Sequence, residues 1–277
     1  RYAIPLKGLI RTTAILSLLS PPFVGAYAWV LLLGRSGFLT GLLHIEGALL
    51  QGANRVLVVF ILHHFAYVFL LVSSALACVE PSLEEAAETM GVGPVTRLFT
   101  ITLPLVGPSI LAGAVLVFTS TLADFGTPML IGDGVRTLPI LAYNEFINEM
   151  GGDIKMASAI SLIMLIVALA VLALSGWVIA GRSYAVYGVR RPAVRSLPVG
   201  LRWLGTGFAL GMTIISSLPQ FVILVASFMH QRGPVFTGEF GLENYHWLWR
   251  RMGNPLTNTL AFSVIAAVIM LLGGMVM

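Results

Sequence analysis

Long stretches without a charged residue alternate with shorter polar segments along the whole chain. Six such windows hold no Asp, Glu, Lys or Arg over at least 23 residues each: 12–34, 56–79, 98–123, 156–181, 203–231 and 252–277. About 20 apolar residues in a helix cross the hydrocarbon core of a bilayer. The pattern therefore predicts an all-α, polytopic membrane protein with about six transmembrane helices. Prolines inside the windows, such as Pro21, Pro22 and Pro219, are expected to kink these helices.

The polar segments between the windows indicate which way the chain is inserted. Segments 1–11, 80–97 and 182–202 must share one side, and together they hold 9 Lys or Arg in 50 residues. Segments 35–55, 124–155 and 232–251 hold 7 in 73. Cytoplasmic loops are richer in Lys and Arg, so the first set is predicted to be cytoplasmic. The external segment 124–155 is long, and its turn signals and apolar stretches predict a short helix or re-entrant piece at the membrane surface.

Composition limits the function classes. The chain has 277 residues, of which 57% are hydrophobic and 10% charged, and its mean hydropathy is +0.93. Soluble domains carry about 25% charged residues, so a soluble enzyme or a disordered tail is excluded. Cys78 is the one cysteine, so no internal disulfide is expected. The net charge of +4 comes from scattered basic residues and does not predict nucleic-acid binding. With Arg1 first and Met277 inside an apolar run, we expect a fragment of a longer chain.

The segment 81–104, PSLEEAAETMGVGPVTRLFTITLP, has the pattern of two short helices joined by a turn. Ser82 and Glu85 have the spacing of a capping box, which predicts a helix start. Gly91 is placed to make the left-handed turn that ends this helix, and Pro94 suits the first turn of the next. The segment is therefore predicted to be a compact helix–turn–helix on the cytoplasmic side.

The first of these helices is expected to be amphipathic. Its apolar stripe consists of Leu83, Ala86, Ala87 and Met90, which recur at helical spacing. Three glutamates occupy the rest of the surface, at positions 84, 85 and 88. Such a helix fits two roles equally: it docks in a groove of a partner and pairs its carboxylates with partner arginines, or it lies against its own membrane helices.

The same segment resembles the EAA loop of binding-protein-dependent ABC importer permeases. The matching positions are Glu85, Ala86, Ala87, Gly91, Ile101, Leu103 and Pro104, at the spacing of that motif. The resemblance implies that this loop sits in a cleft of a cytoplasmic ATPase subunit and transmits ATP-driven closure. Glu85 would then pair with a basic residue of the ATPase, and Gly91 would make the turn between the coupling helices.

Further stretches resemble the ferric-iron branch of this family. Asp124, Phe125 and Gly126, followed by 128–132, are similar to its DFG-x-P-x-LG stretch and imply a place on the translocation pathway. On the residues alone, Asp124 either contacts passing substrate or caps the loop. Residues 242–245 and 258–260 are similar to the opening of a permease domain, and the iron branch often fuses two such halves. The expected domains are a first permease half (1–181), a cytoplasmic linker (182–202) and the beginning of a second half (203–277).

Other polar residues are weighed against ordinary structural roles. His63 and His64 lie inside an apolar window, but neighbouring helix positions point about 100° apart, so packed and hydrogen-bonded histidines are expected rather than one shared site. Glu145, Glu149 and Asp153 either contact a binding protein or form a solvated acidic face. The sequence contains no catalytic constellation and no structural-metal spacing, so neither an enzyme nor a cofactor or metal site is predicted.

The combined prediction is a multi-pass permease subunit of the cell inner membrane. Its expected partners are two cytoplasmic ABC ATPase subunits, a periplasmic solute-binding protein and the lipid bilayer, with no nucleic acid. The expected substrate is ferric iron, and the alternatives are thiamine, a polyamine or a phosphonate. A secondary transporter driven by an ion gradient, or a channel, is the alternative from another class. The charge-free windows count against a proton relay but not against a channel.

Overall fold

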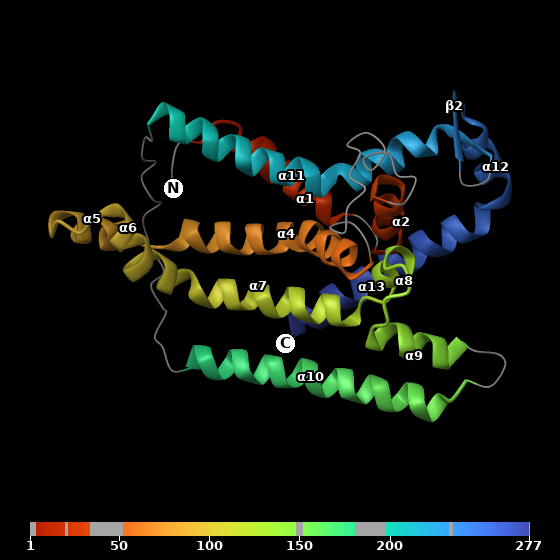
Figure 1. Ribbon diagram of the computed structural model, residues 1–277, viewed down its shortest axis with the longest axis horizontal. Helices are drawn as coiled ribbons and strands as arrows, with labels where there is room; N and C mark the ends of the chain where they lie inside the picture. Colours follow the sequence, from red (N-terminus) through yellow and green to blue (C-terminus); the bar gives the residue numbers. More distant parts are fainter. Residues whose placement is uncertain are drawn as a thin grey trace. The chain divides into compact units, whose positions relative to one another are not determined.

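The computed structural model describes residues 4–19, 22–33, 52–147, 152–180, 198–232 and 235–276, and they are mostly helical (Figure 1). Two compact units divide the chain, and the boundary lies between Val222 and Ile223. The helices are α1 (Lys7–Leu18), α2 (Pro22–Leu33), α4 (Gly52–Cys78), α5 (Pro81–Thr89), α6 (Pro94–Arg97), the π-helical turn η2 (Leu98–Thr102), α7 (Leu103–Ala123), α8 (Gly126–Ile131), α9 (Leu138–Ile147), α10 (Ile154–Ala180), α11 (Val199–Ser227), α12 (Glu243–Arg251) and α13 (Gly253–Val276). A two-stranded antiparallel hairpin of β1 (Met229–Arg232) and β2 (Val235–Phe240) precedes α12.

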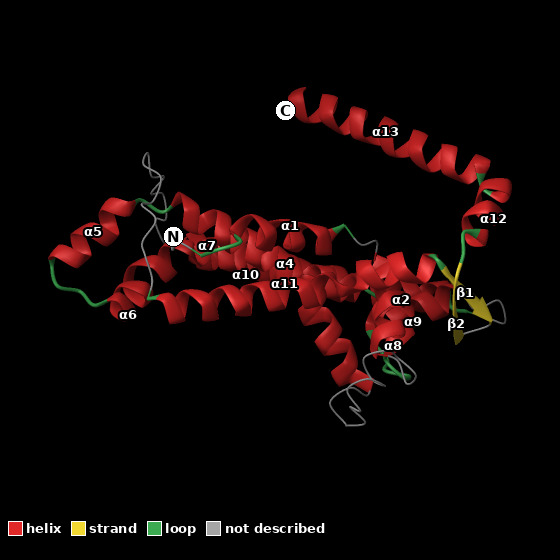
Figure 2. Cartoon of the chain, turned by 90° about the horizontal axis from the view of Figure 1, so that it is seen from above, coloured by secondary structure: helices red, strands yellow, loops and turns green. Residues whose placement is uncertain are grey.

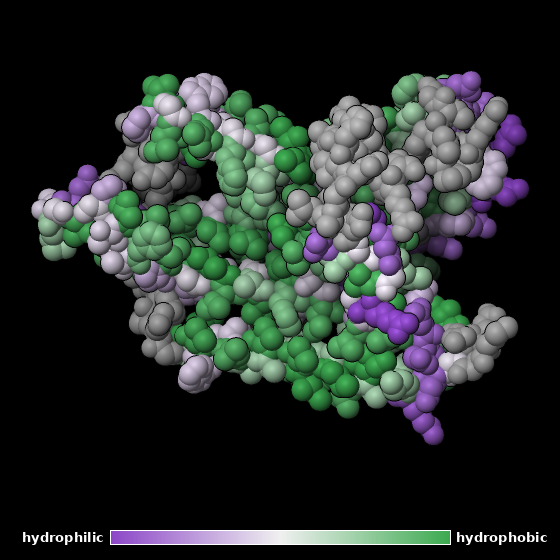
Figure 3. Space-filling model, in the orientation of Figure 1, coloured by the Kyte–Doolittle hydropathy of each residue, from purple (hydrophilic) through white to green (hydrophobic). Residues whose placement is uncertain are grey.

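Five of the described helical segments are long and apolar enough to cross a membrane: Gly52–Cys78, Pro94–Ala123, Ile154–Ala180, Val199–Ser227 and Gly253–Met275. The shortest has 23 residues, which at 1.5 Å per residue gives about 34 Å against a hydrocarbon core of about 30 Å. Apolar side chains cover the middle of α4, α7 and α10, and hydrophilic residues gather at α5 and around α9 (Figure 3). The predicted all-α membrane class is confirmed, with the short hairpin as a small exception.

The first charge-free window, 12–34, does not form the single spanning helix that the sequence pattern predicted. It is divided between α1, which begins before the window and ends at Leu18, and α2, which begins at Pro22. Two consecutive prolines remove two backbone donors and clash with the preceding turn, which ends a helix rather than bending it. The single prolines do not end their helices, because Pro108 and Pro219 lie inside the continuous helices α7 and α11.

The best-packed part of the first unit is an apolar core where α2, α4 and α8 meet. Trp29, Leu32 and Val59 are at most 2% exposed, and Ile131 of α8 completes the cluster from the loop after α7. Along the same unit, α4 and α7 run side by side, as do α7 and α10 (Figure 1), so these helices lie behind one another in the view from above (Figure 2). The core therefore fixes α8 against the end of α4 where the external loops were predicted.

Helix α11 packs on the first unit as far as Val222, although the sequence analysis placed it in a second permease half. The Oγ of Ser216 donates to the carbonyl of Leu62 at 2.6 Å, and Nε2 of Gln220 donates to the carbonyl of Ser17 at 3.1 Å. Small polar residues allow close approach and interhelical hydrogen bonds within a membrane. Most of the predicted linker lies outside the described residues, so the three-part domain division stays a prediction.

Candidate functional site

Helix α5, which opens the predicted coupling segment, begins differently from the sequence prediction. Glu80 takes the N-cap position in an extended conformation, and Pro81 opens the first turn. No side-chain cap hydrogen bond is made, so the predicted capping box of Ser82 and Glu85 is wrong. The reason is that proline is well suited to the first helical position. Starting the helix there moves the Ser82 hydroxyl inside the first turn, where it no longer occupies the cap.

Gly91 makes the turn between α5 and α6, as predicted. Its φ is 76°, in the left-handed region. The Gly91 N–H donates to the carbonyl of Glu88 at 3.0 Å, and the Val92 N–H donates to that of Ala87 at 3.0 Å. This pair of bonds is the Schellman pattern, which satisfies the last carbonyls of a helix and favours glycine at its left-handed position. Pro94 then begins α6, as the sequence also predicted.

The acidic side of α5 is divided between two roles. Oε1 of Glu84 accepts a hydrogen bond from Oγ1 of Thr102 at 2.8 Å, and Oε2 of Glu88 accepts one from Nη1 of Arg97 at 3.0 Å. The same Nη1 also donates to the carbonyl of Glu84 at 3.4 Å. Because Arg97 and Thr102 are buried in α6 and η2, these bonds fasten α5 to the start of the long helix that continues into α7. Two of the three predicted docking carboxylates are therefore engaged inside the loop.

Glu85 and a group of apolar side chains remain on the outside of the helix pair. The Glu85 carboxylate is exposed and has no partner among the described residues. Ala87 of the predicted stripe is buried at 1% exposure, whereas Met90 is 75% exposed and Val95 is 67% exposed. Helix α5 extends beyond the ends of α4 and α7 (Figure 1). This arrangement favours the docking alternative, because α5 packs on α6 and η2 at one end of the span Pro94–Ala123 and not along the length of a membrane helix.

The other motif positions lie around this loop in varied environments. Ala86 is exposed beside Glu85, and Ile101 is half-buried in η2. Leu103 is 41% exposed, and Pro104 is exposed in the first turn of α7. A π-helical turn often marks a functional position in a helix. Here it lies between the helix pair and the membrane-spanning part of the segment, where force from one would pass to the other.

At the opposite end of α7, Asp124 is a loop cap in this structure. Its Oδ1 accepts from the backbone N–H of Thr127 at 3.0 Å, and its Oδ2 accepts from the Thr127 hydroxyl at 2.6 Å. Phe125 stacks on Tyr143 with 4.6 Å between ring centroids, and Gly126 is buried at the start of α8. Asp124, Phe125 and Gly126 thus join α7 to α8 and α9.

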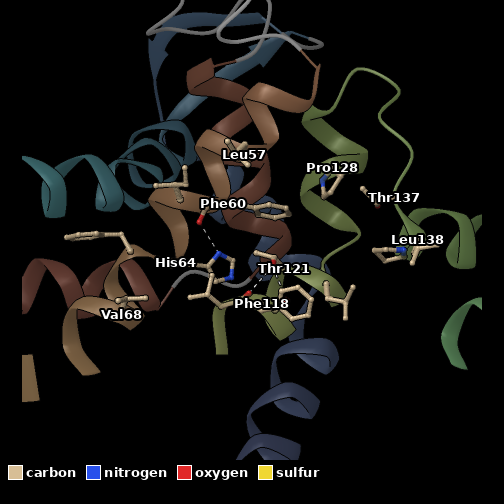
Figure 4. A pocket seen from close by; sticks show the side chains of 14 residues that line it. Leu57, Phe60, His64, Val68, Phe118, Thr121, Pro128, Thr137 and Leu138 are labelled. Carbon is tan, nitrogen blue, oxygen red and sulfur yellow. Dashed lines mark hydrogen bonds between the residues drawn. The ribbon is translucent and has the colours of Figure 1, made fainter. Parts of the chain in front are cut away.

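A pocket of about 620 Å³ lies next to this junction, between α4, α7, α8 and the start of α9 (Figure 4). Its walls are mainly aliphatic and aromatic, with polar atoms from His64, Thr121 and Thr137. His64 is 5% exposed, and its Nδ1 lies 3.0 Å from the carbonyl of Phe60. His63 is not among the residues that line the pocket, and its ring packs edge to face on that of His64 with 5.1 Å between centroids. The intramembrane histidine was the only sequence signal for this pocket.

Arg55 is a structural residue that the sequence analysis missed. It lies in the first turn of α4 at 6% exposure, and its Nη1 is 3.2 Å from Oδ2 of Asp133. The same Nη1 also lies 3.4 Å from the carbonyl of Ile131, 76 residues along the chain. The guanidinium therefore fastens the loop after α8 to the start of α4. Its position at the edge of a charge-free window was the available signal, because such a charge needs a partner.

Replacing Arg55 by methionine is expected to destabilise the purified protein by about 1–3 kcal/mol, since it leaves the Ile131 carbonyl and Asp133 without this donor. Thermal unfolding in detergent measures the loss. Arg136→Met is the matched control, because Arg136 is exposed in the same loop. Equal melting temperatures for the two variants would show that the Arg55 contacts add no stability.

Comparison with known proteins gives one family and several relatives. Residues 2–185 match the family described as the binding-protein-dependent transport system inner membrane component. A Haemophilus influenzae protein whose name assigns it to a ferric transport system as a permease is 30% identical over 92% of this chain and 42% of its own length. The ferric transport system permease protein of Actinobacillus pleuropneumoniae is 28% identical over 95% of this chain and 39% of its own length. The molybdenum transport system permease protein of Escherichia coli K12 is 31% identical over 64% of this chain and 79% of its own length. The chain thus spans about two fifths of the length of the two ferric-system relatives.

Proposed function

Because this chain belongs to the family of binding-protein-dependent transport system inner membrane components, we propose that it is part of the translocating subunit of an ABC importer for ferric iron. Membership confirms the predicted inner-membrane location and a transport protein rather than an enzyme. The ATPase partner, the binding protein and the substrate are parts of the proposal. The single observation that carries it is the helix pair of α5 and α6, with Glu85 and its apolar neighbours exposed around the Gly91 turn.

The proposed mechanism is alternating access driven from the cytoplasmic side. Two ATPase subunits bind the helix pairs of two permease halves, and ATP-driven closure brings these pairs together. The bonds from Glu84 and Glu88 to η2 and α6 make each pair move with the end of α7. ATP binding can drive this change only if the ATPase binds the two states of the permease with different affinity. A periplasmic binding protein delivers the substrate on the other side.

The pocket between α4, α7, α8 and the start of α9 is proposed to be part of the translocation pathway. It lies between α4 and α7, the two helices that flank the coupling segment, so movement of that segment would change its shape. Its mainly apolar wall with a few polar atoms suits a site that substrate passes rather than one that holds it. Selectivity for ferric iron, which prefers hard oxygen ligands, would then reside in the binding protein.

Uptake of radioactive ferric iron by the full-length protein tests the substrate. Proteoliposomes should contain the natural full chain and its ATPase, with the cognate binding protein added outside and ATP enclosed. We expect ATP-dependent iron accumulation that vanishes when ATP or the binding protein is omitted. Molybdate, putrescine and thiamine serve as competing cargoes, since relatives include molybdenum and putrescine permeases. ATP-dependent uptake of one of these without iron uptake would remove the iron proposal and keep the importer. Uptake driven by an ion gradient alone would contradict both the iron proposal and the proposal of an ATP-driven importer.

A further inference from the structure

Helix α12 of the second unit has an apolar side and a polar side, and much of its apolar side is exposed. At about 100° per residue, Tyr245, Leu248 and Trp249 fall on one side, while Arg250 and Glu243 fall on the other. Trp249 is 81% exposed and Leu248 is 43% exposed. A short helix with a large apolar–polar asymmetry, tryptophan and leucine on one face and arginine on the other is typical of the membrane interface.

The chain fixes where α12 must lie. Only Met252 separates its last residue, Arg251, from Gly253, the first residue of α13 (Figure 1). Helix α13 has 24 residues and no charged residue, so it is long and apolar enough to cross the bilayer, and crossing would put its first turn at the membrane surface. A nine-residue helix is about 14 Å long. The two steps through Met252 add up to about 7 Å, so every residue of α12 is within about 20 Å of the level at which α13 would enter the membrane.

Contacts at the start of α12 set which face turns toward the bilayer. Nδ2 of Asn244 donates to the carbonyls of Ser227 and Met229, at 3.3 Å each. The hydroxyls of Tyr245 and Ser227 are 2.7 Å apart, and Tyr245 packs on Phe228 at 5.3 Å between ring centroids. Ser227 is the last residue of the membrane-spanning helix α11. The Tyr245 side of α12 thus rests on the end of a membrane helix, and Leu248 and Trp249 flank it.

The polar face carries two arginines whose chemistry suits an anionic group. The guanidinium of Arg251 lies 4.7 Å from the centroid of the Trp247 ring, which holds the charge beside the helix. Arg250 adds a second guanidinium, and both arginines are exposed. Guanidinium groups bind phosphate oxygens in a bidentate manner, and tryptophan is enriched at the level of lipid headgroups. The charge, the aromatic rings and the depth all match a phospholipid headgroup layer.

We propose that α12 is an interfacial helix that binds anionic phospholipid headgroups through Arg250 and Arg251 and inserts Leu248 and Trp249 at the acyl-chain boundary. This binding would anchor the start of α13 at the membrane surface. The proposal rests on α13 crossing the bilayer and is independent of the transported substrate.

Spin labels on opposite faces of α12 test the insertion. Replacing Cys78, and any further cysteine of the full chain, by serine removes the native thiols, and Trp249→Cys and Glu243→Cys then place a nitroxide on the apolar side and on the polar side of α12. In proteoliposomes of phosphatidylglycerol and phosphatidylcholine, the label at 249 should be relaxed more by oxygen than by a water-soluble nickel complex, and the label at 243 should show the reverse. Equal access of nickel to both labels would overturn the proposal, because α12 would then be in water. Shielding at 249 from both reagents would also overturn it, because protein would cover that face.

A second measurement tests the headgroup. A bimane fluorophore on Trp249→Cys reports contact with brominated lipid, and competition gives the relative affinity for phosphatidylglycerol over phosphatidylcholine. Arg250→Gln and Arg251→Gln should each lower this preference roughly fivefold, while the Lys variants should retain most of it. An unchanged preference in the double Gln variant would overturn the headgroup assignment, even if the label at 249 is inserted.

Discussion

Replacing Gly91 by valine is expected to lower ATP-driven transport at least tenfold while the protein still inserts into the membrane. Gly91 has a φ of 76°, which a β-branched residue adopts only with strain of about 1–3 kcal/mol. Relieving that strain breaks the two hydrogen bonds that end α5 and turns the helix away from α6. Transport and co-purification of the ATPase with the full-length protein measure the effect.

Gly93→Val is the matched control for this variant. Gly93 is exposed two residues away, but its φ is −62° and its ψ is 156°, which valine adopts freely. A side chain added there meets no atom within 4 Å. It therefore adds the same apolar surface without moving the helix. If Gly91→Val transports as well as Gly93→Val does, the left-handed turn has no part in coupling.

Replacing Glu85 by glutamine is expected to weaken binding of the ATPase by tenfold or more without changing the melting temperature of the permease. Glu85 is exposed and has no partner among the described residues, so removing its charge costs the fold little. A carboxylate that pairs with a partner's basic residue in a desolvated interface is worth more than an exposed pair within one protein. Affinity of the reconstituted permease for its ATPase measures the loss.

Glu88→Gln on the same helix distinguishes docking from folding. Glu88 pairs with the buried Arg97, so this change should lower the stability of the helix pair by about 1 kcal/mol. Its effect on ATPase affinity should be smaller than that of Glu85→Gln and should be rescued by lower temperature. If the two variants lose equal affinity and equal stability, Glu85 acts through the fold and not as a docking residue.

Features set by neighbouring residues could be predicted from the sequence. The left-handed turn at Gly91 and the start of α6 at Pro94 depend on backbone preferences of single residues, and both predictions are confirmed. The capping box failed at the same helix because Pro81 competes for the first turn. The prediction of one spanning helix over 12–34 was wrong because it relied on apolar composition and gave too little weight to the two adjacent prolines. Helix α1 ends before them, and α2 begins at the second.

The different roles of the three glutamates could not be predicted from spacing. Helical periodicity places Glu84, Glu85 and Glu88 away from the apolar stripe but does not say which of them faces η2. That depends on where Gly91 directs the chain and on the π-helical turn, which brings Thr102 within 2.8 Å of Glu84. The ion pair of Arg55 with Asp133 could not be predicted for the same reason, since no residue near either of them in the sequence indicates that the two meet.

The sequence by itself determined the membrane class, the position of most spanning helices and the turn at Gly91. These follow from the high cost of burying charge in hydrocarbon and from backbone sterics, which act on residues close together in the chain. Only the tertiary structure decided that Arg55 fastens α8 to α4, that a pocket opens beside His64, and that Glu85 stays exposed. Each of these depends on which helices lie opposite one another. In a membrane, the fit between helix surfaces and a few polar contacts decide which helices pack together, and this cannot be deduced from hydropathy along the chain.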